Sequence, residues 1–457
     1  MSFYSVELPY RTDASHYYAA LADLPWAVWL DSSSMGRYDI MTAAPQCTLV
    51  LDDAESQSDP FAMLRSELGE QVAPIENLPF AGGALGYWGY DLARKMYADV
   101  AGNAGHLPPI ASDKAPEKAP DKTPAMAIGI YDWALVLDHQ QQTARLVSHR
   151  RFAKTTELLP QLLRRLQSNP QLPHDTFRVQ GKITSNFTPD SYAAAFARVQ
   201  DYLHAGDCYQ INLAQCFSAA ASGDALGAYL TLRSLSPAPY SAFLNLPHTQ
   251  ILCASPERFL RVQSGRVETR PIKGTRPRSS NAFQDRQLAD ELRDHPKDRA
   301  ENLMIVDLLR NDLGKSSVPG SVHVPKLFEV ESFANVHHLV STVEGRLAEG
   351  RDALHVLRDS FPGGSVTGAP KLRAMQIIGQ LEPNRRGIYC GAIGYVGFDG
   401  NMDSNIVIRA LVYSGNKIRC WAGGGIVADS EVAAEYQETL DKASAMLELL
   451  STYGGEL

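Results

Sequence analysis

The chain has 457 residues, of which 44% are hydrophobic and 21% are charged, and its formal net charge is −8. This composition is typical of a globular protein, and the acidic balance argues against nucleic acid or an anionic membrane as the main partner. The length exceeds that of one ordinary core, so we expect two large lobes or one large composite domain.

The six cysteines are scattered along the chain and form no CxxC pair. This pattern is typical of reduced thiols in a cytosolic protein, and not of a disulfide framework or a zinc site. Residues 1–18 lack the basic and apolar regions of a signal peptide, and no apolar run approaches the roughly 20 residues that span a bilayer. We therefore expect a cytoplasmic protein without a membrane partner.

The first predicted domain covers residues 1–184 and consists of short strands, turns and one helix. A segment rich in proline, alanine and lysine at 102–124 predicts an exposed, flexible loop. Two strands around a polar turn are expected at 127–149, and a helix at 152–167.

The second predicted domain covers residues 185–457. Thr188 is a plausible cap for a helix that ends at Gly206. Several of the later strands are joined by hairpins, which favours an α+β or mixed α/β fold with antiparallel sheets. The expected strands are 208–220, 241–247, 250–262 and 266–274, followed by a hairpin at 404–425, and the expected helices are 225–235, 297–313 and 430–453.

The last predicted helix carries acidic residues on one face. Glu431, Glu435, Glu438 and Lys442 are spaced by 4, 3 and 4 residues. The pattern fits a solvated charged face with a Glu438–Lys442 pair. It also fits two carboxylates presented to a divalent cation, with the lysine placed for an anionic ligand. Mg²⁺ suits such oxygen donors and commonly takes one or two carboxylates.

The helix at 297–313 offers Asp298 and Glu301 on one face, although acidic residues are common in a first helical turn. A metal site would require the starts of the two acidic helices to converge. Arg409 lies in an otherwise apolar strand, so it needs an anionic partner. That partner is either a structural carboxylate or the carboxylate of a substrate.

Two glycine-rich stretches could bind an anion through backbone N–H groups. "GGSVTGAPK" at 363–371 is not a nucleotide-binding P-loop, because Ala369 and Pro370 precede its lysine. "GGG" at 423–425 lacks the dinucleotide pattern. Glu257 lies near the end of a predicted strand, and Lys273 stands beside a Gly-Thr pair. If they share a pocket, they offer an acid–base group and an amine nucleophile.

Five stretches resemble the signature blocks of the chorismate-utilising enzymes: "PIKGTRPR", "KDRAENLMIVDLLRNDL", "HHLVSTVEG", "GGSVTGAPKLRAM" and "GGGIVADSEVAAEYQETLDKA". This family includes component I of anthranilate synthase and of aminodeoxychorismate synthase, isochorismate synthases and salicylate synthases. "VWLDSSSMGRYDIM" at 28–41 is similar to the amino-terminal region of the first two. The resemblance implies an anthranilate-synthase-like fold, in which large antiparallel sheets pack as a β-sandwich with flanking helices.

Two positions sort the chemistry within the family. Members that use water carry a lysine as general base where this chain has Gln210, and a glutamine cannot deprotonate water. Ammonia needs no such base. Anthranilate synthases have alanine at the position of Lys273, whereas aminodeoxychorismate synthases have lysine. The resemblance therefore implies transfer of ammonia to C4 of chorismate, on the 4-aminobenzoate and folate branch.

The resemblance also implies roles for the site residues. Lys273 attacks ring C2 to form a covalent adduct, and Glu257 protonates the leaving hydroxyl. The expected Mg²⁺ ligands are Glu301, Glu435 and Glu438, with Asp298 possible through water. The expected substrate-binding residues are Gln210, Gly274, Thr275, His338, Thr367, Tyr389, Arg409, Gly424, Gly425 and Lys442.

No glutaminase motif is present in this chain, so the resemblance implies a separate glutaminase subunit that supplies ammonia in a heterodimer. A separate lyase would remove pyruvate. Ser32, Pro239 and Tyr240 lie in stretches similar to the tryptophan pocket of anthranilate synthase. A bound tryptophan and ordinary core packing are equally good interpretations of these residues.

Three rival functions stay open. Anthranilate synthase component I shares almost every site residue, and Lys273 is the discriminator. A non-catalytic anion-binding homologue would have to explain why the acidic helices and the lysine remain together. An isochorismate synthase is disfavoured by Gln210.

Overall fold

The computed structural model describes residues 3–52, 59–103, 123–168, 170, 172, 174–333 and 336–456. Most of the predicted 102–124 loop lies outside these residues, and Gly102 and Asn103 end a helix. None of the described helices is long and apolar enough to cross a membrane.

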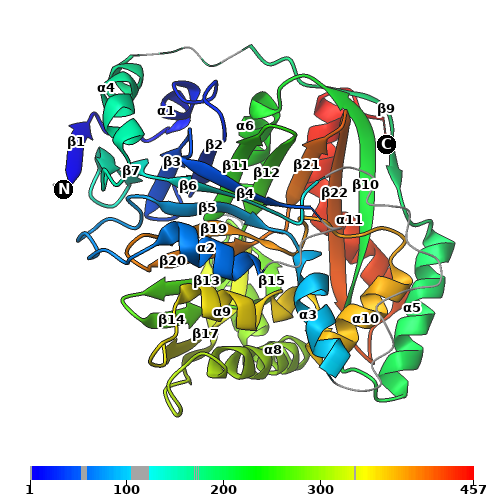
Figure 1. Ribbon diagram of the computed structural model, residues 1–457. Coiled ribbons are helices and arrows are strands. Elements are labelled where there is room, and N and C mark those ends of the chain that lie inside the picture. The colour runs from blue at the N-terminus through cyan, green and yellow to red at the C-terminus, as the bar shows by residue number, and fades with distance from the viewer. Residues whose placement is uncertain are drawn as a thin grey trace.

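Two large antiparallel sheets dominate the described part of the chain (Figure 1). The first runs in the order β1 (Tyr4–Leu8), β8 (Thr143–Ser148), β7 (Trp133–Asp138), β3 (Tyr38–Thr42), β2 (Ala27–Asp31), β11 (Tyr240–Leu246), β12 (Thr249–Ser255), β21 (Ala410–Ser414), β22 (Lys417–Ile426), β10 (Gln210–Ser222) and β18 (Gly368–Ala369), and β9 (Arg178–Ser185) also pairs with β10.

The second sheet lies against the first, and its strand order begins with the strand that carries Lys273. Its order is β15 (Ile272–Pro277), β17 (Val336–Arg346), β14 (Arg266–Thr269), β13 (Arg258–Gln263), β20 (Met402–Ile406), β19 (Ala392–Gly397), β5 (Gly83–Trp88), β6 (Met126–Tyr131) and β4 (Cys47–Leu51), and β16 (His323–Ser332) also pairs with β17. Strands from both sides of residue 184 occur in each sheet, and the 184/185 boundary stays a prediction.

Helices cover the outer faces of the sheets (Figure 1). Their bounds are α1 (Ser15–Ala19), α2 (Pro60–Leu68), α3 (Leu92–Asn103), α4 (Ala153–Gln167), α5 (Pro189–His204), α6 (Leu226–Leu235), α7 (Ala282–Asp294), α8 (Pro296–Gly314), α9 (Ala353–Ser360), α10 (Lys371–Leu381) and α11 (Val432–Thr452), with a 3₁₀ turn η1 at Gly364–Val366.

The core lies between the two sheets, and β11 shows how alternation builds it. Ala242 and Leu244 face the second sheet, while Phe243 faces the helices on the other side of the first sheet. Successive side chains of a strand point to opposite faces, so one strand serves two apolar layers. The predicted sandwich with flanking helices is confirmed.

Most predicted helices are confirmed. The helix at 297–313 is α8, the final helix is α11, and Thr188 caps α5 with a capping box. The two strands expected at 127–149 are in fact three, β6 to β8, because the chain passes from the second sheet to the first between β6 and β7.

The predicted strand at 250–262 and the first strand of the predicted hairpin at 404–425 are each interrupted, for one physical reason. The stretch 250–262 breaks into β12 and β13, and the stretch 404–425 begins with β20 before the β21–β22 hairpin. In both cases the chain changes sheet, and a strand that changes sheet must bend at a corner. The two corners touch, since Ile406 N donates to Glu257 O and Ala254 N donates to Arg409 O. This contact places Glu257 and Arg409 in one region.

Candidate active site

Lys273 lies at a bulge of β15. Gly274 has a φ of +78°, and the register of β15 against β17 shifts between Lys273 and Thr275. A Cβ at Gly274 would lie 2.8 Å from Asp298 Cγ, so the close approach of α8 requires glycine. Lys273 Nζ lies 3.8 Å from Glu301 Oε2, and both side chains are mostly buried. The predicted nucleophile therefore lies beside a predicted metal ligand.

Glu257 lies at the corner between β12 and β13, and it is buried. Ser365 Oγ donates a hydrogen bond of 2.9 Å to Glu257 Oε1. Burial raises the pKa of Glu257 to about 7, while the hydrogen bond from Ser365 and the charge of Lys273 act in the opposite direction. A carboxyl group that titrates near neutral pH can both give up and recover a proton.

His338 on β17 faces Thr275 on β15. Its Nδ1 lies 2.9 Å from Thr275 Oγ1. Burial lowers the pKa of His338 to about 4, and the charge of Arg409 acts in the same direction. The imidazole is therefore uncharged at neutral pH and can hydrogen-bond to a ligand without adding charge.

The apolar neighbours of Arg409 predicted a position inside a strand, and this prediction is wrong. It lies between β20 and β21 with a φ of +50°, a left-handed conformation that is uncommon for arginine. Burial lowers its pKa, and among the described residues no carboxylate forms an ion pair with it. The structural ion pair is therefore wrong within the described residues, and a ligand carboxylate is the remaining alternative.

Glu435 and Glu438 stand side by side at the start of α11. A Cβ on Gly424 would lie 2.8 Å from Glu435 Oε2 and 3.5 Å from Glu438 Oε1, so both carboxylates face the end of β22. Glu435 Oε1 accepts from Ser430, and Glu435 Oε2 is buried without a described partner. Burial raises the pKa of Glu435. Its burial corrects the interpretation of this helix face as simply solvated.

Lys442 lies one turn beyond Glu438 on α11. Its Nζ donates to Glu438 Oε1 at 2.5 Å and to Gly423 O at 3.0 Å. Burial acts to raise the pKa of Glu438, but the neighbouring lysines, Lys442 foremost, outweigh it and lower that pKa. The predicted Glu438–Lys442 pair is confirmed, and it lies beside the three glycines near the end of β22.

Gln210 begins β10 and is completely buried. Neither its Oε1 nor its Nε2 has a hydrogen-bond partner among the described residues. Its amide lies 3.1 Å from where a Cβ of Gly425 would be, so it faces the same strand end as the two carboxylates. An unpartnered buried amide is costly in a folded protein and is expected where a ligand binds.

Tyr389 and Thr367 complete the predicted set. Both are buried, and the ring of Tyr389 stacks on Trp421 of β22 with centroids 6.1 Å apart. The Thr367 hydroxyl donates to the carbonyls of Gly363 and Gly364, so it closes its own turn. That turn lies beside Gln210 through the pairing of β18 with β10.

The four predicted Mg²⁺ ligands do not form one cluster. Among the described residues, no three acidic, histidine or cysteine side chains are close enough to hold a metal ion. Asp298 is paired with Arg276 and His295, and Glu301 is paired with Lys273. Glu435 and Glu438 do lie together, and Oε2 of Glu435 has no described partner. Two such carboxylates fit Mg²⁺, which commonly takes only one or two carboxylates from a protein.

A cavity of about 890 Å³ is not lined by Lys273 or Glu257. It lies behind them, since Pro256 and Ile272 line it and each is a chain neighbour of a site residue. The predicted tryptophan-pocket residues are brought together in its wall: Ser32, Pro239 and Tyr240.

Two features of the site escaped sequence analysis. Ser365 lies inside the quoted glycine-rich block, but nothing in the pattern assigned it to Glu257. Arg386 and Glu382 form a buried ion pair behind the turn. The stretch "EPNRRG" at 382–387 is rich in charged residues, which are mostly exposed in proteins, so only the structure could identify this buried pair.

The comparisons with known proteins cover nearly the whole chain. The chorismate binding enzyme family matches residues 27–448. The chain is 46% identical to aminodeoxychorismate synthase component 1 of Escherichia coli (strain K12), over 97% of this chain and 98% of that protein. It is 40% identical to anthranilate synthase component 1 of Streptomyces coelicolor, over 85% and 77%.

A solved structure supports the fold. The crystal structure of anthranilate synthase component I from Streptococcus pneumoniae TIGR4 matches with a TM-score of 0.78 at 33% identity, covering 90% of this chain and 92% of that one.

Proposed function

Since the chain belongs to the family of chorismate-binding enzymes, we propose that it converts chorismate and ammonia to 4-amino-4-deoxychorismate. The single observation that carries this proposal is Lys273, which lies in the site beside Glu301 and close enough to Glu257 for its charge to act on that carboxyl group. Full-length similarity to aminodeoxychorismate synthase component 1 supports the same reaction.

The reaction begins with a displacement at the ring. Lys273 first transfers its proton to the Glu257 carboxylate, on which its charge acts. The neutral amine then forms a bond to ring C2, the ring double bond shifts, and the C4–O bond breaks. Glu257 gives its proton to the departing hydroxyl, which leaves as water. A carboxyl group with a pKa of about 7 is protonated in a large fraction of molecules at neutral pH, as this step requires.

Ammonia completes the exchange. It forms a bond to C4, the double bond shifts back, and the C2–N bond breaks with its electron pair returning to Lys273. The new ammonium group loses a proton, which Glu257 recovers. The balance is chorismate plus ammonia giving aminodeoxychorismate plus water, with the enolpyruvyl group retained. Covalent catalysis thus divides one hard substitution into two easier ones.

The remaining residues bind and orient the substrate. Arg409 and Lys442 would meet the enolpyruvyl carboxylate, with the N–H groups of Gly424 and Gly425 beside them. Thr275 and His338 would line the ring. Gln210 has free hydrogen-bonding capacity for ammonia or substrate and cannot act as a base toward water.

We include Mg²⁺ as the expected cofactor. Glu435 and Glu438 would hold it, and Glu301, which is paired with Lys273 in this structure, would join them only once that pair has opened. When bound, it would neutralise the ring carboxylate of chorismate.

Two partners follow from the proposal. A separate glutaminase subunit would supply ammonia, in keeping with the "component 1" names of the relatives. Tryptophan would fit the cavity behind the site, whose wall contains Ser32, Pro239 and Tyr240. The six unpaired thiols support a cytoplasmic location.

The test is a product assay. The protein, chorismate, Mg²⁺ and an ammonium salt should yield a product that keeps the enolpyruvyl group. Release of pyruvate together with fluorescent anthranilate would instead support anthranilate synthase component I, which the similarity to anthranilate synthases keeps as the second candidate. Absence of any turnover with a folded protein would support a non-catalytic homologue.

A further inference from the structure

The hydrogen bond between Ser365 and Glu257 fixes one carboxyl oxygen. Ser365 Oγ donates to Glu257 Oε1 over 2.9 Å, and both residues are more than nine-tenths buried, at 8% and 6% exposed. An oxygen that accepts a hydrogen bond is a poorer place for the acidic proton. The proton of neutral Glu257 is therefore directed to Oε2, the oxygen that does not accept from Ser365. The backbone N–H of Ile272 also hydrogen-bonds to this carboxyl group and acts on its pKa in the same direction as Ser365.

The turn that carries Ser365 is itself held in place. Ser365 lies in η1, and the hydroxyl of Thr367 closes the turn onto Gly363 and Gly364. Arg386 Nη1 donates to Val366 O over 2.8 Å. The residues on both sides of Val366 are thereby fixed, and one of them is Ser365.

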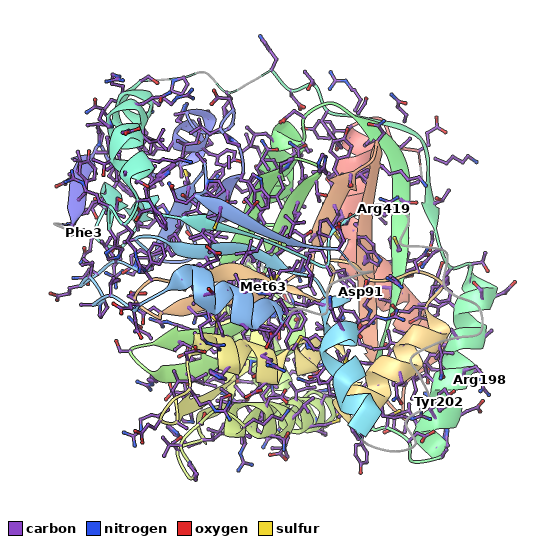
Figure 2. The ribbon with its side chains drawn as sticks, viewed as in Figure 1. Phe3, Met63, Asp91, Arg198, Tyr202 and Arg419 are labelled. Atoms are coloured by element: carbon purple, nitrogen blue, oxygen red, sulfur yellow. The ribbon has the colours of Figure 1, made fainter. Side chains whose placement is uncertain are left out.

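Arg386 is anchored in turn by buried partners. Its Nη2 lies 2.6 Å from Glu382 Oε1 and donates over 2.8 Å to Asn212 O on β10. Gly387 N donates to Asp91, which lies at the start of α3 (Figure 2). A buried ion pair is weak evidence for stability, because desolvation offsets its attraction. Here Arg386 joins β10 to the turn behind Glu257, and its neighbour Gly387 joins them to the start of α3.

We propose that Ser365 is a positioning residue for Glu257: its hydroxyl holds the carboxyl group so that the proton on Oε2 faces the departing hydroxyl of chorismate. The inference rests on the proposed role of Glu257 as the acid. Ser365 does not touch the reacting atoms, and its effect passes through Glu257.

The charged and titratable groups that face Glu257 come from three segments. Lys273 on β15 and Lys442 on α11 lower the pKa of Glu257, as does the hydrogen bond from Ser365. Cys390 lies near enough for Glu257 to raise the pKa of its thiol, to about 12 with burial as the larger cause, so this thiol stays neutral. Removal of the Ser365 hydroxyl should therefore raise the pKa of Glu257, while the lysines are unchanged.

The experiment compares Ser365→Ala and Ser365→Thr with the wild type. The rate of aminodeoxychorismate formation is measured against pH, with the concentration of free ammonia held constant. We expect Ser365→Ala to lower kcat by about tenfold. Its alkaline limb should move up by about one pH unit, since a hydrogen bond to a charged group is lost. Ser365→Thr keeps a hydroxyl and should restore both the rate and the limb.

Ser148→Ala is the matched control, because Ser148 is an equally buried serine that donates to the backbone of Asp132 in another part of the fold. Infrared titration of the Glu257 carboxyl, identified by its loss in Glu257→Gln, gives a readout that does not depend on turnover. The proposal is overturned if Ser365→Ala keeps the wild-type rate, if its pH profile has the wild-type limb, or if its carboxyl titrates as in the wild type. If the wild type makes no product, the proposed function fails, and the infrared titration still decides whether Ser365 controls Glu257.

Discussion

The cavity lined by Ser32 and Tyr240 and the site around Lys273 lie back to back, and they differ in how their polar groups are satisfied. In the wall of the large cavity, Asp31 accepts hydrogen bonds from Arg233, Tyr229 and the backbone of Ser33. In the site around Lys273, the amide of Gln210 and one oxygen of Glu435 are buried without described partners. The cavity wall therefore has an acid that the fold itself satisfies, whereas the site around Lys273 has buried polar groups without described partners.

The comparison predicts that substitutions in the two regions differ in their effects on turnover and on stability. Changes in the Lys273 site should abolish or alter turnover without lowering stability. Changes in the cavity wall should lower stability and leave turnover intact.

The largest effect is expected for Lys273→Ala. Loss of the nucleophile removes the covalent route, so kcat should fall by about 10³-fold or more while the fold remains. The rate of aminodeoxychorismate formation measures this, and circular dichroism checks the fold. Lys417→Ala, at the exposed first residue of β22, is the control and should be unaffected. Full activity of Lys273→Ala would show that the covalent route is wrong.

Glu257→Gln should come next, with a fall in kcat of about 10²- to 10³-fold from loss of the acid. The kcat of Glu257→Gln should fall, whereas its stability at alkaline pH should rise. Because the folded pKa of Glu257 is raised to about 7 from 4.5, the folded state gains protonation stability that is complete below about pH 4.5 and is lost as pH rises through about 7.

Glutamine carries no charge, so Glu257→Gln should be more stable than the wild type at about pH 8.5, by on the order of 2–3 kcal/mol, and nearly equal at about pH 4.5. Urea unfolding at the two pH values tests this difference. Equal stabilities at both values would contradict the burial of an uncompensated carboxylate.

Glu438→Gln should have a more limited effect. Removal of one of the two adjacent carboxylates should raise the Mg²⁺ concentration for half-maximal activity by at least about tenfold. Glu431→Gln, on the exposed residue before α11, should leave the titration unchanged. An unaltered Mg²⁺ curve for Glu438→Gln would exclude this residue as a ligand.

The smallest effect on turnover is expected for Asp31→Asn. The substitution removes a buried charge that pairs with Arg233 at 2.7 Å, so the free energy of unfolding should fall by about 2–3 kcal/mol. The kcat of the folded protein should change less than about twofold, because breaking a buried ion pair away from the reacting atoms acts on stability. Asp23→Asn removes an exposed pair with Arg165 and should cost less than about 1 kcal/mol. A large loss of kcat in Asp31→Asn would break the comparison between the two regions.

The five helices predicted from the sequence are present, because their signals are local. Thr188 and the periodic apolar residues after it define α5 without reference to the rest of the chain. The corners at Glu257 and Arg409 could not be predicted, because a change of sheet depends on strands that are distant in sequence. Both stretches have the apolar alternation of one long strand.

The site was predicted to the extent that motifs carry it. Lys273 and the α11 carboxylates were predicted from family-like blocks, and Glu257 from its place near the end of a predicted strand, but their environments were not predicted. The burial of Glu435, the partner Ser365 and the anchor Arg386 all depend on packing between β10, the 363–367 turn and α11. Such contacts leave no periodic signal in the sequence.

The most direct test of the central claim is the mass of the intact protein after incubation with chorismate and Mg²⁺ in the absence of ammonia. We predict an added mass of chorismate less one water, located on Lys273 by peptide mapping and released when an ammonium salt is added. An active enzyme that never carries this mass, or that carries it on another residue, would contradict the account.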